Sequence, residues 1–255
     1  NLKRKIMDKI IRHNWIIVIL LFVISEVLIN PIGEFPLNDD WAYSKPIFTF
    51  LNSGEIIFLE WQAIPGLSLQ AAGLLFCEIF GYSFTSLRLV SILATIILII
   101  TFNQILKFYE LKPKLRFITL LVLLFNPLTL SLSNTFMPDI FILMLTLIGF
   151  LFMAQIFKEF KRHSFILFIV FTLLATLVRQ TGIILPLAFA VVYLLTHPLK
   201  LKHLLIGLLP ILLNIIVLFI YVLFFKKIGN LPVSFNYQFE HIIQVLSHPS
   251  ISLLN

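Results

Sequence analysis

Charged residues are scarce in this 255-residue sequence, at 12% of the chain against 60% for hydrophobic residues. A soluble domain typically carries about 25% charged residues, so the composition excludes an ordinary soluble protein and indicates a membrane protein. Cysteine is almost absent. The single copy, Cys77, excludes an internal disulfide and any metal site built on cysteine ligands. The sequence also lacks a Walker motif, a dinucleotide fingerprint and a Ser or Cys nucleophile motif.

Long apolar runs are abundant instead, and several reach the ~17–25 residues that a helix needs to cross a bilayer. The first run is not followed by a small-residue cleavage site, so it is interpreted as a retained anchor. The runs are Trp15–Ile29, Ala63–Phe80, Phe84–Phe108, Phe117–Thr135, Ile140–Phe157, Phe165–Val178, Ile183–Leu195 and Leu204–Phe225. We expect an all-α fold, a polytopic transmembrane helical bundle that forms one module over residues 1–255. Because the chain starts without methionine, we expect an N-terminal fragment of a longer protein.

The positions of the basic residues predict which runs cross the membrane, because cytoplasmic loops are enriched in Lys and Arg. If Ala63–Phe80 does not cross, most of the 19 Lys and Arg residues fall inside, including the cluster at residues 3–12. The outer ones are then Lys45, Arg88, Arg179, Lys226 and Lys227. If Ala63–Phe80 crosses, the bias disappears. We therefore expect an interfacial helix there, about seven spans, and an outer loop at 30–83 with juxtamembrane helices. The net charge of +7 does not indicate nucleic-acid binding, because the basic residues cluster beside the apolar runs.

Two adjacent carboxylates, Asp39 and Asp40, follow the first apolar run in the outer loop. Neighbouring carboxylates repel each other, which raises the pKa of one of them and suits a general base. They are also ligands for a hard divalent cation such as Mg²⁺ or Mn²⁺. The alternative is an ordinary helix N-cap and first turn, where negative charge is favoured.

Further charged residues fall on the same predicted side of the membrane. Asp139 follows Pro138 at the expected start of a helix, where it either stabilises the first turn or converges on Asp39 to share a metal ion. Arg179 interrupts two short apolar runs; it either binds a phosphate or extends to the interface. Arg88 and Glu60 are candidate substrate contacts, although extension to the interface is the simpler explanation for Arg88.

Several short motifs, in this order, resemble the GT-C superfamily of membrane glycosyltransferases, especially its protein O-mannosyltransferase and lipid A aminoarabinose transferase branch. The acidic pair has the form Asp39-Asp40-x-x-Tyr43. The other matching stretches are Pro65–Phe80, Phe80–Leu89, Asn126–Asp139 and Leu177–Gly182. The sequence departs from the family pattern in having Asp40 where many relatives have Glu, and Arg179 where others have Lys.

This resemblance implies transfer of a sugar from a polyprenyl-phosphate carrier to a glycan, lipid or protein acceptor on the non-cytoplasmic face. It implies that Asp39 and Asp40 are catalytic, that Asp139 is the second acidic position, and that Tyr43, Glu60, Arg88 and Arg179 bind substrate. A bacterial plasma (inner) membrane, with membrane lipid around the spans, is the expected location. The alternatives are a multi-span transporter, against which the sequence shows no internal repeat, and a non-catalytic subunit of a polysaccharide assembly complex.

Overall fold

The computed structural model describes residues 14–247, so the basic cluster expected at residues 3–12 lies outside the described residues. Within the described range the chain is helical and has no strand, which confirms the all-α fold. The elements are α2 (Asn14–Ile29), α3 (Asp40–Ser53), α4 (Leu67–Phe80), α5 (Phe84–Phe108), α6 (Pro113–Leu124), α7 (Pro127–Leu132), α8 (Pro138–Lys158), α9 (Arg162–Val178), the 3-10 turn η1 (Gln180–Ile183), α10 (Ile184–Thr196), α11 (Leu201–Lys227) and α12 (Val233–Ser247).

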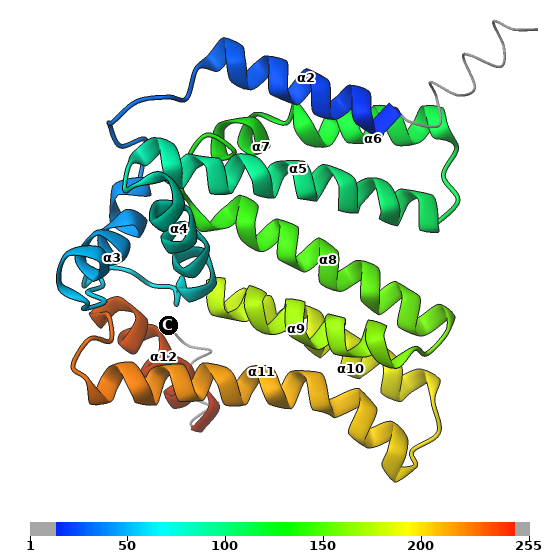
Figure 1. The fold of residues 1–255 in the computed structure, drawn as a ribbon. Helices are drawn as coiled ribbons and strands as arrows, with labels where there is room; N and C mark the ends of the chain where they lie inside the picture. The colour runs from blue at the N-terminus through cyan, green and yellow to red at the C-terminus, as the bar shows by residue number, and fades with distance from the viewer. Residues whose placement is uncertain (1–13, 248–255) are drawn as a thin grey trace, which may run out of the picture.

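The long helices lie side by side in a layered bundle, with α2 and α6 at one edge and α11 at the other (Figure 1). Among the described helices, α5, α8 and α11 are long and apolar enough to cross a bilayer, and α2, α9 and α10 are shorter apolar helices. This confirms a membrane helical bundle. The helices α3 and α4 lie at one end, here called the α3–α4 end, and α5 and α8 finish at the opposite end (Figure 1).

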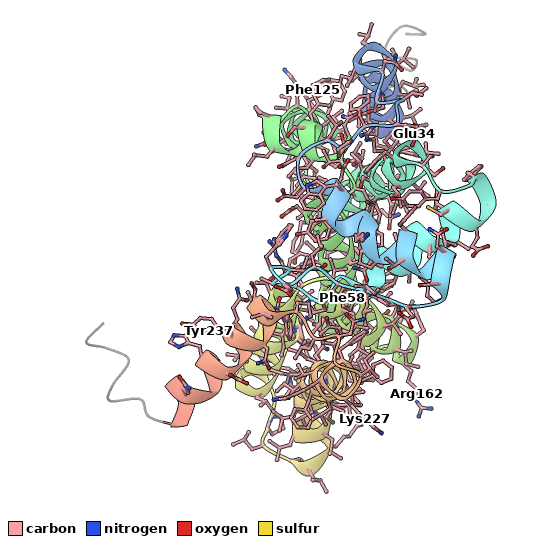
Figure 2. All side chains as sticks on the ribbon, turned by 90° about the vertical axis from the view of Figure 1, so that its left-hand side faces the viewer. Glu34, Phe58, Phe125, Arg162, Lys227 and Tyr237 are labelled. Carbon is pink, nitrogen blue, oxygen red and sulfur yellow. The ribbon has the colours of Figure 1, made fainter. Side chains whose placement is uncertain are left out.

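Figure 2 looks onto the α3–α4 end and shows α3 lying across the front of the bundle. The apolar side chains beneath it form one core, in which Ile47 of α3 and Leu69 of α4 pack with Phe136, the residue two positions before α8. Gly73 makes this approach possible, since a Cβ there would lie 2.6 Å from both Ile47 Cδ1 and Phe136 Cζ. The helices α3 and α4 are therefore packed closely against the segment that precedes α8.

The expected span Phe117–Thr135 is not one helix, because the structure divides this run into α6 and α7, which together lead from the end of α5 to the α3–α4 end (Figure 1). Pro127 has no N–H with which to continue the helix, and Asn126 caps the new one by accepting the Leu128 N–H at 2.9 Å. The interfacial helix is also shorter than Ala63–Phe80. It begins at Leu67, after Gly66 takes a left-handed conformation with φ of 69°.

Polar side chains join α9 to α11 inside the apolar bundle. Asn214 is fully buried; it donates to Thr172 Oγ1 at 3.2 Å and accepts from Thr176 Oγ1 at 2.6 Å. Its amide also donates to the carbonyl of Pro210, the proline inside α11. Because buried polar groups are costly when unpaired, these hydrogen bonds fix how α9 sits against α11. Helix α9 ends at the candidate site.

Candidate functional site

The two adjacent carboxylates occupy different environments. Asp39 is the N-cap residue of α3, but its side chain makes no capping hydrogen bond, and among the described residues no hydrogen bond or ion pair engages its half-buried carboxylate. Asp40 is fully buried, and its Oδ1 accepts the Leu37 N–H at 2.8 Å. Asp40 therefore binds the backbone at the start of α3, as expected if the pair only capped a helix. Asp39 makes no such bond and remains available to a ligand.

Arg88 holds residues 31–40, here called the acidic loop, onto α5 from inside. Its side chain is 1% exposed and lies 3.5 Å from Asp40 Oδ2. It also donates to the carbonyls of Pro31 at 2.9 Å and Gly33 at 3.1 Å, and to that of Phe35. With its guanidinium enclosed in this way, Arg88 has no surface for a substrate in this structure, and its geometry is that of an anchor for residues 31–40.

A break between α9 and α10 places Arg179. The chain leaves α9 in an extended conformation at Arg179 and then forms η1. Gly182 allows η1 to fold back onto the last turn of α9, since a Cβ there would lie 2.4 Å from the Thr176 nitrogen. Arg179 Nη1 donates to Asp139 Oδ1 at 2.9 Å, and both side chains remain partly exposed, at 39% and 34%.

Tyr43 lies within electrostatic range of this ion pair and of Asp39. Burial raises the pKa of its hydroxyl, the positive charge of Arg179 lowers it, and the negative charges of Asp139 and Asp39 raise it. All three charges therefore act on one phenol. A hydrogen bond from Asn38 Nδ2 to Met137 Sδ, 3.5 Å long, also joins the segment before α3 to the segment before α8. The structure thus brings Asp39, Tyr43, Asp139 and Arg179 into one cluster, here called the acidic-loop cluster.

An apolar groove of about 490 Å³ extends from this cluster between α8 and α10. Asp139 and Thr181 stand at its polar end, and Ile142, Leu185 and Ala188 are among the side chains that line it. Ile184, which also lines the groove, is 61% exposed on the outside of the bundle. A charged pair therefore adjoins a groove that is open towards the lipid side.

Glu60 is not drawn into the cluster by any contact among the described residues. Its side chain is exposed, and its carbonyl accepts the Ser234 N–H at the start of α12. Gln180 was not among the predicted site residues, yet its amide donates to the Ala63 carbonyl at 2.7 Å and ties the α9–α10 break to the outer loop. Its only signal in the sequence was its place beside Arg179.

The divalent cation between Asp39 and Asp139 stays a prediction. A magnesium-like ion is held by one or two carboxylates, with waters and substrate phosphate as its other ligands. In residues 14–247 no group of three or more His, Cys, Asp or Glu side chains is arranged to hold a metal, and Asp139 Oδ1 is already bound by the Arg179 cation. Asp39 and Asp139 are the residues that would hold such an ion, and the chemistry below is derived for the side chains alone.

Comparison with known proteins identifies the family. A family model described as dolichyl-phosphate-mannose-protein mannosyltransferase matches residues 71–225, more than half of the chain. This family belongs to the GT-C superfamily, which confirms the resemblance. The matched range contains Arg88, Asp139 and Arg179 and begins after the acidic pair. No curated protein and no solved structure matches the chain. The chain therefore belongs to the dolichyl-phosphate-mannose-protein mannosyltransferase family of membrane glycosyltransferases.

Proposed function

We propose that this protein transfers a sugar from a polyprenyl-phosphate carrier to an acceptor hydroxyl on the non-cytoplasmic face, with Asp39 as the general base. The observation that carries the proposal is the Arg179–Asp139 pair, which stands at the polar end of an apolar groove and beside Tyr43. A polyprenyl-phosphate sugar has this same division, with a charged phosphate at one end of a long hydrocarbon chain.

The groove between α8 and α10 suits the hydrocarbon tail, because its lining is apolar and its side is open towards lipid. The phosphate would then lie near Arg179, whose planar guanidinium binds phosphate through paired hydrogen bonds. Arg179 is partly exposed and shares one nitrogen with Asp139, so it has donors left for a ligand. Asp139 fixes the guanidinium in place before the substrate arrives.

Asp39 is suited to take the proton, since its carboxylate is partly exposed and engaged by no partner among the described residues. The acceptor oxygen attacks C1 of the sugar while its proton passes to Asp39. The bond from C1 to the phosphate oxygen breaks with its electron pair, and polyprenyl phosphate leaves with its negative charge stabilised by Arg179. Attack opposite the leaving phosphate inverts the configuration at C1. No nucleotide site is required.

The test is a transfer assay on the full-length protein with radiolabelled polyprenyl-phosphate sugars, comparing Asp39→Asn with wild type. Loss of the base should lower turnover by about 10²–10⁴-fold, while binding of the donor is retained. Glu55→Gln is the matched control, because Glu55 is an exposed carboxylate of the same outer loop that takes no part in the acidic-loop cluster. Normal turnover by Asp39→Asn, at equal expression, would exclude Asp39 as the base.

A further inference from the structure

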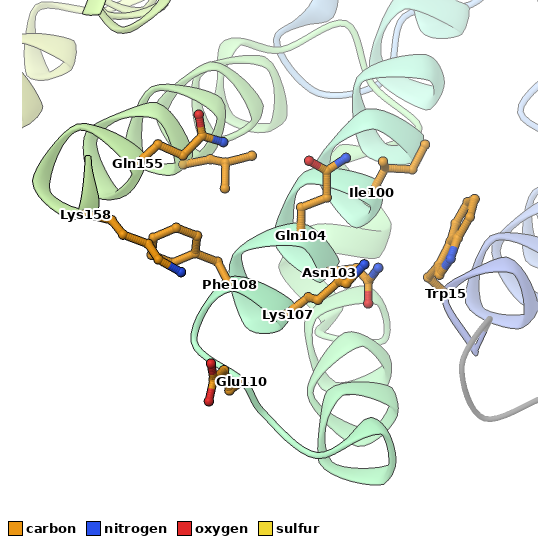
Figure 3. Close-up of a pocket in the computed structure, with 10 residues that line it drawn as sticks. Trp15, Ile100, Asn103, Gln104, Lys107, Phe108, Glu110, Gln155 and Lys158 are labelled. Atoms are coloured by element: carbon orange, nitrogen blue, oxygen red, sulfur yellow. The ribbon is translucent and has the colours of Figure 1, made fainter. Parts of the chain in front are cut away.

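A second pocket, of about 540 Å³, lies at the end of the bundle opposite α3 and α4. One face of α5 forms its floor, because the lining residues Ile100, Asn103, Gln104, Lys107 and Phe108 recur at helical spacing. The last two turns of α8 contribute Leu151, Gln155 and Lys158, and Trp15 closes it from α2 (Figure 3). The pocket lies between three membrane helices and shares no residue with the acidic-loop cluster.

Asn103 is the buried polar group of this pocket. Its side chain is 8% exposed, and its Oδ1 has no hydrogen-bond donor among the residues that the structure describes. Figure 3 shows the amide on the side of α5 that faces Trp15, and Lys107 lies one helical turn further along the same face. A buried carbonyl oxygen without a donor is costly, so this position favours a ligand that brings a hydroxyl group.

Two lysines supply the charge of the pocket. Lys107 makes no ion pair within residues 14–247, and the Lys158 ammonium lies 5.2 Å from the centre of the Phe108 ring. Glu110 is the only acidic residue in the lining, and it is exposed. The two lysines come from different helices and both line the pocket, with Lys107 on the side of Asn103 and Lys158 beside Phe108 (Figure 3).

We propose that this pocket binds the headgroup of an anionic glycerophospholipid whose phosphate diester carries a hydroxyl-bearing alcohol, as phosphatidylglycerol does. Lys107 and Lys158 supply the positive charge that attracts the phosphate, and Asn103 Oδ1 accepts a headgroup hydroxyl. Basic pockets between membrane helices bind such headgroups, and Trp15 is the kind of side chain that sits at headgroup level. Ile100 and Leu151 continue the lining in apolar side chains, where an acyl chain would begin. The lipid belongs to the leaflet opposite the candidate active site.

The experiment titrates detergent-solubilised full-length protein with phosphatidylglycerol and counts retained lipids by native mass spectrometry. The double variant Lys107→Gln/Lys158→Gln should bind the most tightly held lipid at least about tenfold more weakly, because each lysine near the membrane surface contributes strongly to anionic binding. Lys112→Gln/Lys114→Gln is the matched control, since both lysines are exposed at the same end, outside the pocket. Equal loss in the two double variants would show that only general surface charge attracts the lipid, and would overturn the site.

Two further arms identify the ligand. Inorganic phosphate at millimolar concentration should fail to displace the lipid; displacement would mean that the pocket takes a small free anion instead. Asn103→Leu, which keeps the side-chain size, should lower the affinity for phosphatidylglycerol and leave that for phosphatidic acid, which has no headgroup alcohol, within about twofold. Equal effects on both lipids, in protein with an unchanged melting curve, would contradict the role of Asn103 in recognising the headgroup.

Discussion

At the scale of single residues, Arg88 and Asp40 form a buried ion pair on which the position of the acidic loop depends. Burial raises the pKa of Asp40, while the Leu37 N–H and the charge of Arg88 lower it. Arg88 in turn donates to three loop carbonyls. Removing one partner of such a pair leaves a buried charge and is far more damaging than removing both.

Arg88→Met should therefore destabilise the protein by about 3–5 kcal/mol at neutral pH, as measured by chemical unfolding in detergent. Without Arg88 the pKa of Asp40 rises further above its unfolded value, so protonation of Asp40 relieves the buried charge at low pH. The loss of stability should shrink as the pH falls and grow as it rises. The double variant Arg88→Met/Asp40→Leu should recover part of the stability. A single variant as stable as wild type would contradict the anchoring role.

Tyr43→Phe tests the phenol at the centre of the acidic-loop cluster. Because burial raises the pKa of Tyr43 above its usual value of about 10, the hydroxyl stays protonated at neutral pH and is available to donate a hydrogen bond to a substrate. Removing it should lower turnover by about threefold to tenfold, equally across roughly pH 6–8. The measurement is the pH–rate profile of both proteins. A loss that varied with pH in this range would indicate that the phenol ionises during the reaction.

The residues alone predicted that an acidic pair matters, and only the family resemblance favoured Asp39 as the catalytic position of the two. Asp39 and Asp40 are chemically identical neighbours. Asp40 is bound and Asp39 is not, because Arg88 pairs with Asp40. Arg88 is far along the chain and was expected to be a substrate contact or an interface residue. Such long-range pairing has no local signature, so this part of the site required the structure.

At the scale of elements, the break between α9 and α10 places Arg179, and its geometry depends on Gly182. Gly182→Ala would put a Cβ 2.4 Å from the Thr176 nitrogen and 2.5 Å from the Ala175 carbonyl carbon. Backbone atoms cannot yield as side chains do, so η1 must shift and take Arg179 away from Asp139. We expect turnover to fall at least about tenfold, since small displacements of a positioning group are costly.

Gly207→Ala is the control for this substitution, because its Cβ would meet only side-chain atoms of Leu194, at 3.0 Å, and Tyr193, at 3.4 Å, and neither residue lines the groove. That variant should keep most of its activity in the same transfer assay. Equal activity in Gly182→Ala and wild type would show that the α9–α10 break tolerates movement, and that Arg179 is not held by it.

The sequence predicted the helices that consist of long apolar runs, and it did not predict those that lie in polar or mixed segments. The runs that became α5, α8 and α11 were identified close to their observed limits. Helices α3 and α12 lie in segments without an apolar run; tertiary contacts stabilise them, as when Phe235 packs against Tyr221 and Phe225. The break at Asn126-Pro127 was overlooked because the surrounding hydropathy is continuous, although a proline after a capping residue is a start signal for a helix.

At the scale of the whole molecule, the two ends of the bundle should face opposite sides of the membrane, as the distribution of basic residues predicts. Cysteines introduced at Asn52, the exposed end of α3, and at Lys112, between α5 and α6, lie at opposite ends. A membrane-impermeant thiol reagent added outside intact cells should label only Asn52→Cys. The native Cys77 is 3% exposed and serves as an internal negative control. Labelling of Lys112→Cys alone would invert the proposed topology.

The lateral opening of the groove between α8 and α10, beside the exposed Ile184, has a kinetic consequence. A donor that enters there never leaves the bilayer, so encounter between enzyme and donor takes place in two dimensions. The relevant substrate quantity is then the number of donor molecules per unit area of membrane. Adding inert phospholipid to reconstituted vesicles, with total donor and protein held constant, should slow turnover below saturation, although no concentration in the aqueous volume has changed.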